Sequence, residues 1–286
     1  MKILAAAIQM SSEPLGVAAN LAKADELLRR AHGDGAQLAV LPEMFNTGYG
    51  LLPDYGPSAE DRGGPTLRHL AHRSREWGMA IAAGFVEREA HHLYDSVAFA
   101  MPDGQVHVYR KRNLVFWERF RFRPGREPLV VATPWGRIGF AVCADMIYRR
   151  VWDDYRGRID LAIVAAAWPD FADRETGHKH WLFGHVGPLS GAIPAKVAAD
   201  LGIPVVFANQ CGETQTVIPI LKTKIADRFA GLSSLSDGRH GPTIQAGTGE
   251  QVLLAPLTLH PPQGPRTWRS TSPSAPAASS SASARG

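Results

Sequence analysis

The chain has 286 residues, of which 45% are hydrophobic and 20% charged, and its formal net charge is +4 at pH 7. This composition is ordinary for a globular protein of one large domain or two small ones. No apolar run is long enough to span a bilayer, and so small a charge excess does not indicate a nucleic-acid partner. The two cysteines, Cys143 and Cys211, are too few for a disulfide framework and are typical of reduced thiols in a cytoplasmic protein.

Apolar strands alternate with amphipathic helices through the first part of the chain. We interpret the apolar N-terminus as a buried strand and not as a signal peptide, because Gln9 and a polar Ser-Ser-Glu-Pro stretch follow it. An apolar stripe at helical spacing marks the first helix. The elements predicted here are, in order, a strand at 3–10, a helix at 16–31, a strand at 37–41, a helix at 66–77 and strands at 79–86, 94–100 and 105–109.

The second part continues the alternation. The turn residues Pro102-Asp-Gly-Gln105 predict a hairpin that joins the strands at 94–100 and 105–109. The elements predicted after this turn are strands at 129–132 and 138–142, a helix at 148–155, a strand at 161–166, a helix at 193–201 and a strand at 204–208. Helices between apolar strands, with hairpins inserted, indicate a layered α/β domain over residues 1–263. Residues 264–286 are rich in Ser, Pro and Ala and predict a disordered tail.

Three chemically active side chains stand at the ends of predicted strands. Glu43 ends the apolar run from Ala39, Lys111 follows the strand at 105–109, and Cys143 follows the strand at 138–142. A thiolate can split the hydrolysis of an unreactive amide into two easier steps through a thioester. Glu43 can accept the thiol proton and pass it to the departing nitrogen. The three residues therefore indicate covalent hydrolysis of a carbon–nitrogen bond.

Supporting groups lie close to these three residues in the sequence. We expect Lys111 to stabilise both the thiolate and the oxyanion of the tetrahedral intermediate, with the backbone N–H of Ala144 as a second oxyanion donor. Glu118 is a second carboxylate that can keep Lys111 charged and orient the substrate nitrogen. Each residue alone is weak evidence, and it is their order along the chain that favours an active site.

Four stretches of the chain resemble the nitrilase superfamily of carbon–nitrogen hydrolases, and the resemblance covers roughly residues 1 to 260. Weaker similarities occur at His180-Trp181 and at 205–212. The four stretches are Leu41-Pro-Glu43-Met-Phe, Tyr109-Arg-Lys111-Arg-Asn-Leu114, Glu118 through Phe122-Arg-Pro124-Gly125, and Gly139-Phe-Ala-Val-Cys143-Ala-Asp145.

The resemblance implies a four-layer α-β-β-α sandwich and a Glu43–Lys111–Cys143 triad. It implies hydrolysis of a nonpeptide amide, carbamoyl group or nitrile, with no metal and no organic cofactor. It also implies a small-molecule substrate, with neither nucleic acid nor membrane as partner, and a homodimer or higher homo-oligomer. Asp145 after Ala144 is more typical of amidase branches than of nitrilases proper, so amide hydrolysis is the first hypothesis.

One departure from the family pattern concerns the substrate. Carbamoyl-amino-acid hydrolases grip a substrate carboxylate with an arginine shortly after the nucleophile, where this chain has Ile147. Arg149 or Arg150 could replace that arginine or could face solvent. The aromatic side chains Tyr49, Trp117, Trp168 and Phe171 are candidate pocket residues, and they would favour an apolar or aromatic acyl group.

Several alternatives remain open at this point. The same residues would hydrolyse a nitrile through a thioimidate, or an N-carbamoyl compound. The histidines His178, His180 and His185 could instead make a cysteine–histidine hydrolase or, with less typical spacing, a zinc site. A scaffold without catalysis is disfavoured because the glutamate, lysine and cysteine are all present.

Overall fold

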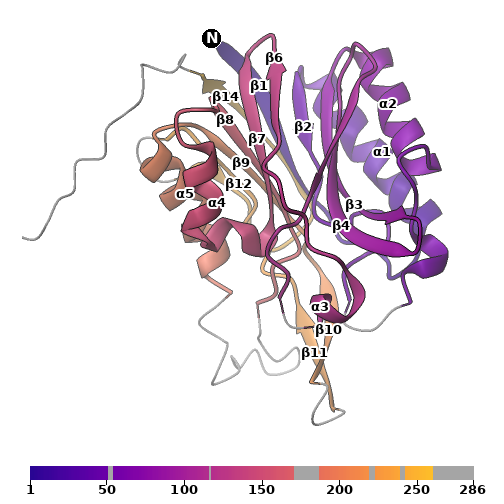
Figure 1. Cartoon of the computed structure of the whole chain (residues 1–286). Coiled ribbons are helices and arrows are strands. Elements are labelled where there is room, and N and C mark those ends of the chain that lie inside the picture. The colour runs from indigo at the N-terminus through magenta and orange to yellow at the C-terminus, as the bar shows by residue number, and fades with distance from the viewer. Residues whose placement is uncertain (51–53, 116, 171–186, 219–222, 239–241, 260–286) are drawn as a thin grey trace, which may run out of the picture.

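The fold comes from a computed structural model of the chain (Figure 1), which describes residues 1–50, 54–115, 117–170, 187–218, 223–238 and 242–259. For residues 214–218 and 223–227 it describes the backbone alone. The candidate pocket residue Phe171, the three clustered histidines, the His180-Trp181 pair and the expected tail at 264–286 lie outside the described residues. Among the described helices, none combines the length and apolar character needed to cross a membrane.

The first of two six-stranded sheets is built mainly from the N-terminal half. Its strand order is β14-β1-β2-β3-β4-β5, with β1, β2 and β3 parallel and the outer pairs antiparallel. The strands are β1 (Lys2–Gln9), β2 (Leu38–Val40), β3 (Ala80–Glu89), β4 (His92–Ala100), β5 (Val106–Arg110) and β14 (Gln251–Thr258). The last strand of the chain thus returns to pair with the first.

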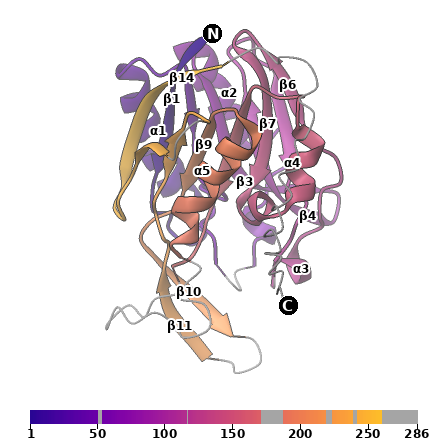
Figure 2. The same ribbon diagram turned by 90° about the vertical axis from the view of Figure 1, so that its left-hand side faces the viewer.

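The second sheet has a similar mixed arrangement, in the order β13-β12-β9-β8-β7-β6, with β7, β8 and β9 parallel. Its strands are β6 (Val130–Thr133), β7 (Gly136–Val142), β8 (Leu161–Ala166), β9 (Val205–Asn209), β12 (Ser234–Ser236) and β13 (Pro242–Gln245). A separate two-stranded ribbon of β10 (Glu213–Ile218) and β11 (Thr223–Arg228) projects from one end of the molecule (Figure 2).

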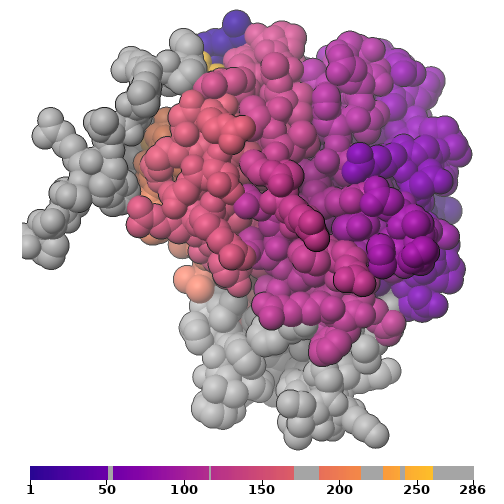
Figure 3. Space-filling model, in the orientation of Figure 1, coloured from indigo at the N-terminus to yellow at the C-terminus, as the bar shows by residue number. Residues whose placement is uncertain are grey.

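Helices cover the outer face of each sheet. Helices α1 (Val17–Gly33) and α2 (Pro65–Trp77) lie on the first sheet, and α4 (Arg149–Tyr155) and α5 (Leu189–Leu201) lie on the second (Figure 1). The order across the molecule is therefore helix, sheet, sheet, helix, and the predicted four-layer α-β-β-α sandwich is confirmed. Short helices η1 (Gly56–Ser58), α3 (Glu118–Arg121) and η2 (Cys143–Ile147) lie in the connections. In the space-filling view the indigo-to-magenta half of the chain packs directly beside the later half (Figure 3).

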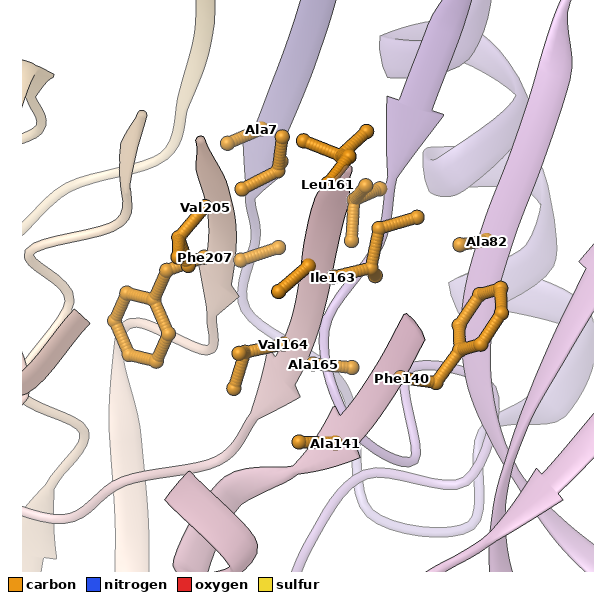
Figure 4. Close-up of a cluster of buried hydrophobic side chains, with 14 of the residues drawn as sticks. Ala7, Ala82, Phe140, Ala141, Leu161, Ile163, Val164, Ala165, Val205 and Phe207 are labelled. Atoms are coloured by element: carbon orange, nitrogen blue, oxygen red, sulfur yellow. The ribbon is translucent and has the colours of Figure 1, made fainter. Parts of the chain in front are cut away.

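The core follows from the two-residue period of the strands. Ala5 and Ala7 of β1 face the second sheet, whereas Ala6 and Ile8 face the helices on the outer side. Between the sheets, small alanines of one layer oppose larger side chains of the other, among them Phe140 of the second sheet (Figure 4). This close packing fixes the two sheets against each other, so their strand ends meet at defined positions.

The predicted helices and strands are all present, with ends that differ by a few residues. The largest difference is α5, which begins at Leu189 and not at Ile193. The short α3 and the strands β10 to β14 were not predicted. Strand β12 has only three residues, and β14 contains Pro256, which its place at the edge of the sheet permits because edge strands need fewer backbone donors.

Candidate active site

Three of the side chains that the sequence singled out form one buried cluster. The Lys111 ammonium Nζ donates hydrogen bonds to Glu43 Oε1 at 2.6 Å and to Glu118 Oε1 at 2.7 Å. All three side chains are 0% exposed. Cys143 is 6% exposed and lies close enough for the charges of these three residues to shift its pKa. The acid, the amine and the sulfur therefore converge where the two sheets meet.

Glu43 stands in the loop three residues beyond β2, and both sheets hold it. Its Oε2 accepts a hydrogen bond from the backbone N–H of Ala167 at 2.6 Å, just after β8 of the second sheet. The side-chain amide of Gln210, just after β9, donates to the Glu43 carbonyl oxygen at 2.8 Å. The loop also passes tightly over Gly84 of β3. The position of this carboxylate is thus set by contacts from several strands.

Lys111 directly follows β5, as predicted. The Pro-Gly pair downstream explains how its backbone is placed, because the N–H of Gly125 donates to the Lys111 carbonyl oxygen at 2.7 Å. A Cβ on Gly125 would collide with the carbonyl oxygen of Arg110. The glycine therefore allows two backbone segments to approach closely beside the buried lysine.

Cys143 begins η2 directly after β7, with a positive φ of 44° that is unfavourable for a residue with a side chain. Asp145 stabilises this turn through hydrogen bonds. Its carboxylate accepts hydrogen bonds from the Tyr109 hydroxyl at 2.8 Å, from the Asn113 side chain at 2.7 Å and from the Val142 N–H at 3.2 Å. The buried aspartate after the nucleophile candidate is therefore a structural anchor for the strained turn.

The charges of the cluster set the protonation of its members. Burial alone would lower the pKa of Lys111, but the carboxylates of Glu118, Glu43 and Asp95 raise it well above its usual range. Burial is also the largest cause that raises the pKa of the Cys143 thiol, followed by the negative charge of Glu43, and together they outweigh the lowering effect of Lys111. In the resting protein the ammonium is charged and the sulfur carries its proton.

Asp95 is the residue of the cluster that the sequence analysis missed. It lies in β4, its side chain is 0% exposed, and its Oδ2 is 3.2 Å from Lys111 Nζ. The predicted hairpin contained the signal, because the β4–β5 register extended by one pair beyond Ser96 and Arg110 places Asp95 opposite Lys111. The backbone N–H of Lys111 also donates to the backbone carbonyl oxygen of Asp95 at 2.8 Å.

The carboxylates of Glu43, Asp95 and Glu118 offer oxygen atoms that all lie within 4.8 Å of one another. Such a group could attract a cation. The Lys111 ammonium contacts all three carboxylates and already supplies a positive charge at their centre. The chemistry of the cluster can thus be understood from the side chains of the chain itself.

Aromatic side chains surround Glu118. The Tyr49 hydroxyl donates to Glu118 Oε1 at 2.7 Å, and the N–H of Val115 donates to its Oε2 at 2.9 Å. The rings of Trp117 and Phe229 both meet the ring of Tyr49 edge-on, with ring centroids 5.2 Å and 6.3 Å away, respectively. Two of the candidate pocket residues therefore lie beside the cluster, together with Phe229, which follows the unpredicted β11.

The other predicted site residues lie nearby or away from the cluster. Trp168 is buried in the same hydrophobic cluster as Cys143, and its backbone N–H donates to Asn209 Oδ1 at 2.7 Å. Ala144 is buried as the second residue of η2, which keeps its backbone N–H next to the sulfur-bearing residue. The fourth candidate pocket residue, Phe171, is outside the described part of the chain.

The residues from the end of η2 onward make contacts outside the buried cluster of Glu43, Lys111 and Glu118. Ile147 is 50% exposed. Arg149 pairs with Asp153 along α4, at 3.6 Å. Arg150 donates to the Asn113 side chain, which itself holds Asp145, and it lines a surface groove of about 720 Å³ whose lining does not include Glu43, Lys111 or Cys143. Arg150 is thus connected to the turn through Asn113 and Asp145.

The chain also resembles known proteins in sequence and in fold. A family model described as carbon-nitrogen hydrolase matches residues 4–234. The chain is 32% identical to a nitrilase of Pyrococcus abyssi over 145 residues, which are 49% of this chain and 55% of that protein. It is 32% identical to omega-amidase NIT2 of Bos taurus over 175 residues, which are 57% of this chain and 61% of that protein. The matches span less than two thirds of the length of these relatives.

Among solved structures, XC1258 from Xanthomonas campestris is described as a CN-hydrolase superfamily protein with an arsenic adduct in the active site. It superposes with a TM-score of 0.75 over 90% of this chain and 91% of that chain, at 23% sequence identity. Similarity at this level of identity shows that the two chains share a fold.

Proposed function

The chain belongs to the carbon–nitrogen hydrolase family, and on that premise we propose that it hydrolyses a nonpeptide amide to a carboxylic acid and ammonia or an amine. The observation that carries the proposal is the buried Lys111 ammonium, hydrogen-bonded to both Glu43 and Glu118 beside Cys143. The relatives named omega-amidase and nitrilase act on carbon–nitrogen bonds by name, which supports the same class of reaction.

In the first half of the proposed reaction, Cys143 attacks the amide carbon. The sulfur is protonated in the resting site, so its proton passes to Glu43 as the carbon–sulfur bond forms. Lys111 and the N–H of Ala144 stabilise the oxyanion of the tetrahedral intermediate. Glu43 then gives the proton to the nitrogen, the carbon–nitrogen bond breaks, and ammonia or an amine departs. The acyl group remains bound to the Cys143 sulfur as a thioester.

In the second half, water attacks the thioester. Glu43 takes a proton from the water as the new carbon–oxygen bond forms, and the same oxyanion donors act again. The carbon–sulfur bond then breaks, the sulfur regains a proton from Glu43, and the carboxylic acid leaves. The sum is one amide and one water consumed, and one acid and one ammonia or amine released. Glu118 keeps Lys111 charged throughout, with Tyr49 donating to the same carboxylate oxygen.

Two other substrates remain candidates. A nitrile would follow the same steps through a thioimidate, and the relative named nitrilase favours that candidate. An N-carbamoyl amino acid is less favoured, because Ile147 cannot bind a carboxylate and Arg150 is engaged with Asn113. The aromatic side chains of Tyr49, Trp117 and Trp168 support an apolar or aromatic acyl group.

A screen of ammonia release tests the function. Matched amides, nitriles and carbamoyl compounds with the same acyl group are incubated with the enzyme, and acid and ammonia are measured. Mass spectrometry with a slow amide should show an acyl adduct on Cys143. Cys143→Ala should fold and lose turnover, whereas Cys211→Ala serves as the matched control and should retain it. Labelling of Cys211, or turnover by Cys143→Ala, would contradict the proposal.

We also propose a cytoplasmic location and a homo-oligomeric assembly. Both cysteines are unpaired, which suits a reducing compartment. Ile147 of η2 and Leu189 of α5 are exposed apolar side chains on neighbouring elements, which supports a contact between copies. Sedimentation of Leu189→Glu should then show a smaller particle than the wild type, and Leu15→Glu, at an exposed site before α1, should not. An unchanged particle in both variants would contradict this assembly.

A further inference from the structure

Asp95 is a buried carboxyl group to which no side chain or backbone group of the described residues donates a hydrogen bond. Its side chain is 0% exposed, and neither carboxyl oxygen has a hydrogen-bond partner among the residues that the structure describes. The Lys111 ammonium is 3.2 Å from Oδ2, but its short hydrogen bonds go to Glu43 and Glu118. A carboxylate in this setting is costly, because among the described residues no hydrogen bond replaces the water that it lost and only the ion pair with Lys111 offsets the loss.

The other two carboxylates are well supplied with donors. Glu43 accepts from Lys111 on one oxygen and from the Ala167 N–H on the other. Glu118 accepts from Lys111, from the Tyr49 hydroxyl and from a backbone N–H. Hydrogen bonds to the charged form favour ionisation. If one carboxyl group of the cluster carries a proton, the hydrogen bonding selects Asp95.

The charge balance requires such a proton. With every carboxyl group ionised, three negative charges would surround the one ammonium of Lys111 in a site that excludes water. Uncompensated buried charge is strongly unfavourable, and closely spaced carboxyl groups cannot all ionise together. A neutral Asp95 leaves two carboxylates around the ammonium, each with its own donors.

We propose that Asp95 is a neutral carboxylic acid that donates a hydrogen bond to the Glu43 carboxylate and so acts as a positioning residue for it. Its protonated state follows from the geometry alone, whereas its effect on catalysis rests on the proposed function. When Asp95 is neutral, it does not compete for the Lys111 ammonium, which can then interact with Glu43, Glu118 and the developing oxyanion. Burial and the charge of Glu43 raise the pKa of Asp95 well above its usual range, in agreement with this assignment.

The pH dependence follows from the groups that face Asp95. They are Glu43 beyond β2, Lys111 beyond β5, Glu118 on α3 and the phenol of Tyr55, whose pKa the charge of Asp95 raises. Cys143 on η2 interacts with the same glutamates and lysine. Below its raised pKa, Asp95 is neutral. As the pH rises through that pKa it ionises, competes for Lys111 and adds a negative charge near the sulfur, so turnover should fall on the alkaline side.

Infrared spectroscopy of the resting protein tests the protonated state without any substrate. At neutral pH the wild type should show the carbonyl stretch of a protonated carboxylic acid, and this band should disappear as the pH is raised. The band should be absent in Asp95→Asn. Asp145→Asn is the matched control, because Asp145 is also a buried acid, and it should keep the Asp95 band. No band in the wild type, or a band lost only in Asp145→Asn, would overturn the proposal.

Kinetics test the positioning role. Asp95→Ala, which has no donor, should lower kcat by about 100-fold, a typical loss for a disturbed acid–base group. Asp95→Asn keeps an N–H donor and does not titrate, so it should recover at least about tenfold of that loss and move the alkaline limb of the rate profile to higher pH. Equal losses in both variants with an unchanged pH profile would mean that Asp95 only fills space.

Thermal unfolding gives a third readout, independent of turnover. The folded protein binds the Asp95 proton more tightly than the unfolded chain does, so this group costs stability increasingly as the pH rises from the unfolded pKa toward the folded one. Asp95→Asn removes that cost. Its melting temperature relative to the wild type should therefore increase between acidic and neutral pH, and a difference that stays constant with pH would contradict a neutral Asp95.

Discussion

Gly84 of β3 lies directly against the backbone of Glu43. A Cβ at position 84 would collide with the Glu43 Cα and stand only 2.6 Å from the Pro42 carbonyl oxygen and 2.7 Å from the Met44 nitrogen. The same segments are joined by hydrogen bonds, from the Gly84 N–H to Pro42 at 3.0 Å and from the Phe45 N–H to Gly84 at 3.0 Å. The glycine is therefore part of what sets the position of the proposed base.

Gly84→Ala should displace the Glu43 loop, because the clashing atoms are backbone and cannot rotate away. A shift of the base by about 1 Å is enough to lower the rate about 100-fold. We expect a large fall in kcat together with a lower melting temperature. Gly33→Ala at the end of α1, where a Cβ would meet nothing within 4 Å, is the matched control. A fully active Gly84→Ala would show that the loop tolerates displacement.

Tyr49→Phe removes one donor from Glu118 and leaves the aromatic packing in place. Hydrogen bonds to a charged group contribute about 1.5–3 kcal/mol, so we expect kcat to fall by about 10-fold to 100-fold if the carboxylate must stay fixed beside Lys111. Tyr94→Phe is a control outside this cluster. Steady-state kinetics with the best amide from the screen are the measurement. A KM effect with no change in kcat would instead assign the Tyr49 hydroxyl to substrate binding.

Alkylation of Cys143 reports its protonation directly. Its pKa is raised, so in a Cys211→Ala background the rate with iodoacetamide should climb with pH into the alkaline range. After burial, the Glu43 charge is the largest cause of the increase. Glu43→Gln should therefore shift the alkylation profile to lower pH even though turnover is lost. A shift to higher pH would mean that Glu43 favours the thiolate in the resting site.

Trp168 tests the acyl pocket. It is 6% exposed, so Trp168→Ala would cost about 3–5 kcal/mol of stability, and this would obscure any effect on substrates. Trp168→Phe keeps most of the packing. It should change the ratio of kcat/KM between bulky and small amides, whereas Trp152→Phe, at a buried position within α4, should not. An equal loss against every amide, in step with a lower melting temperature, would place Trp168 in the core alone.

Much of the site could be predicted from the sequence because its members follow strands. Lys111 and Cys143 come directly after β5 and β7, and Glu43 follows β2 by three residues. The ends of strands in packed sheets converge, so local patterns were sufficient to find these residues. Their roles in catalysis remain predictions.

The missed residues depend on contacts between distant segments. Asp95 lies inside a strand, and a polar residue in an alternating strand pattern is usually predicted to be exposed. Only the hairpin register places it opposite Lys111. Gln210 reaches Glu43 across 167 positions of the chain. Phe229 follows a ribbon strand with no strong apolar pattern. Pairing between remote segments is set by packing, which a single sequence does not reveal.

The proposed base belongs to one sheet by chain connection, yet one of its carboxylate oxygens is held by the Ala167 N–H of the other. Cys143 also belongs to that second sheet, whereas Lys111 belongs to the first. Mild denaturant or pressure that separates the two sheets should therefore abolish the proposed turnover, while the circular dichroism spectrum still shows native secondary structure. Residual turnover would then measure how firmly the two halves are docked.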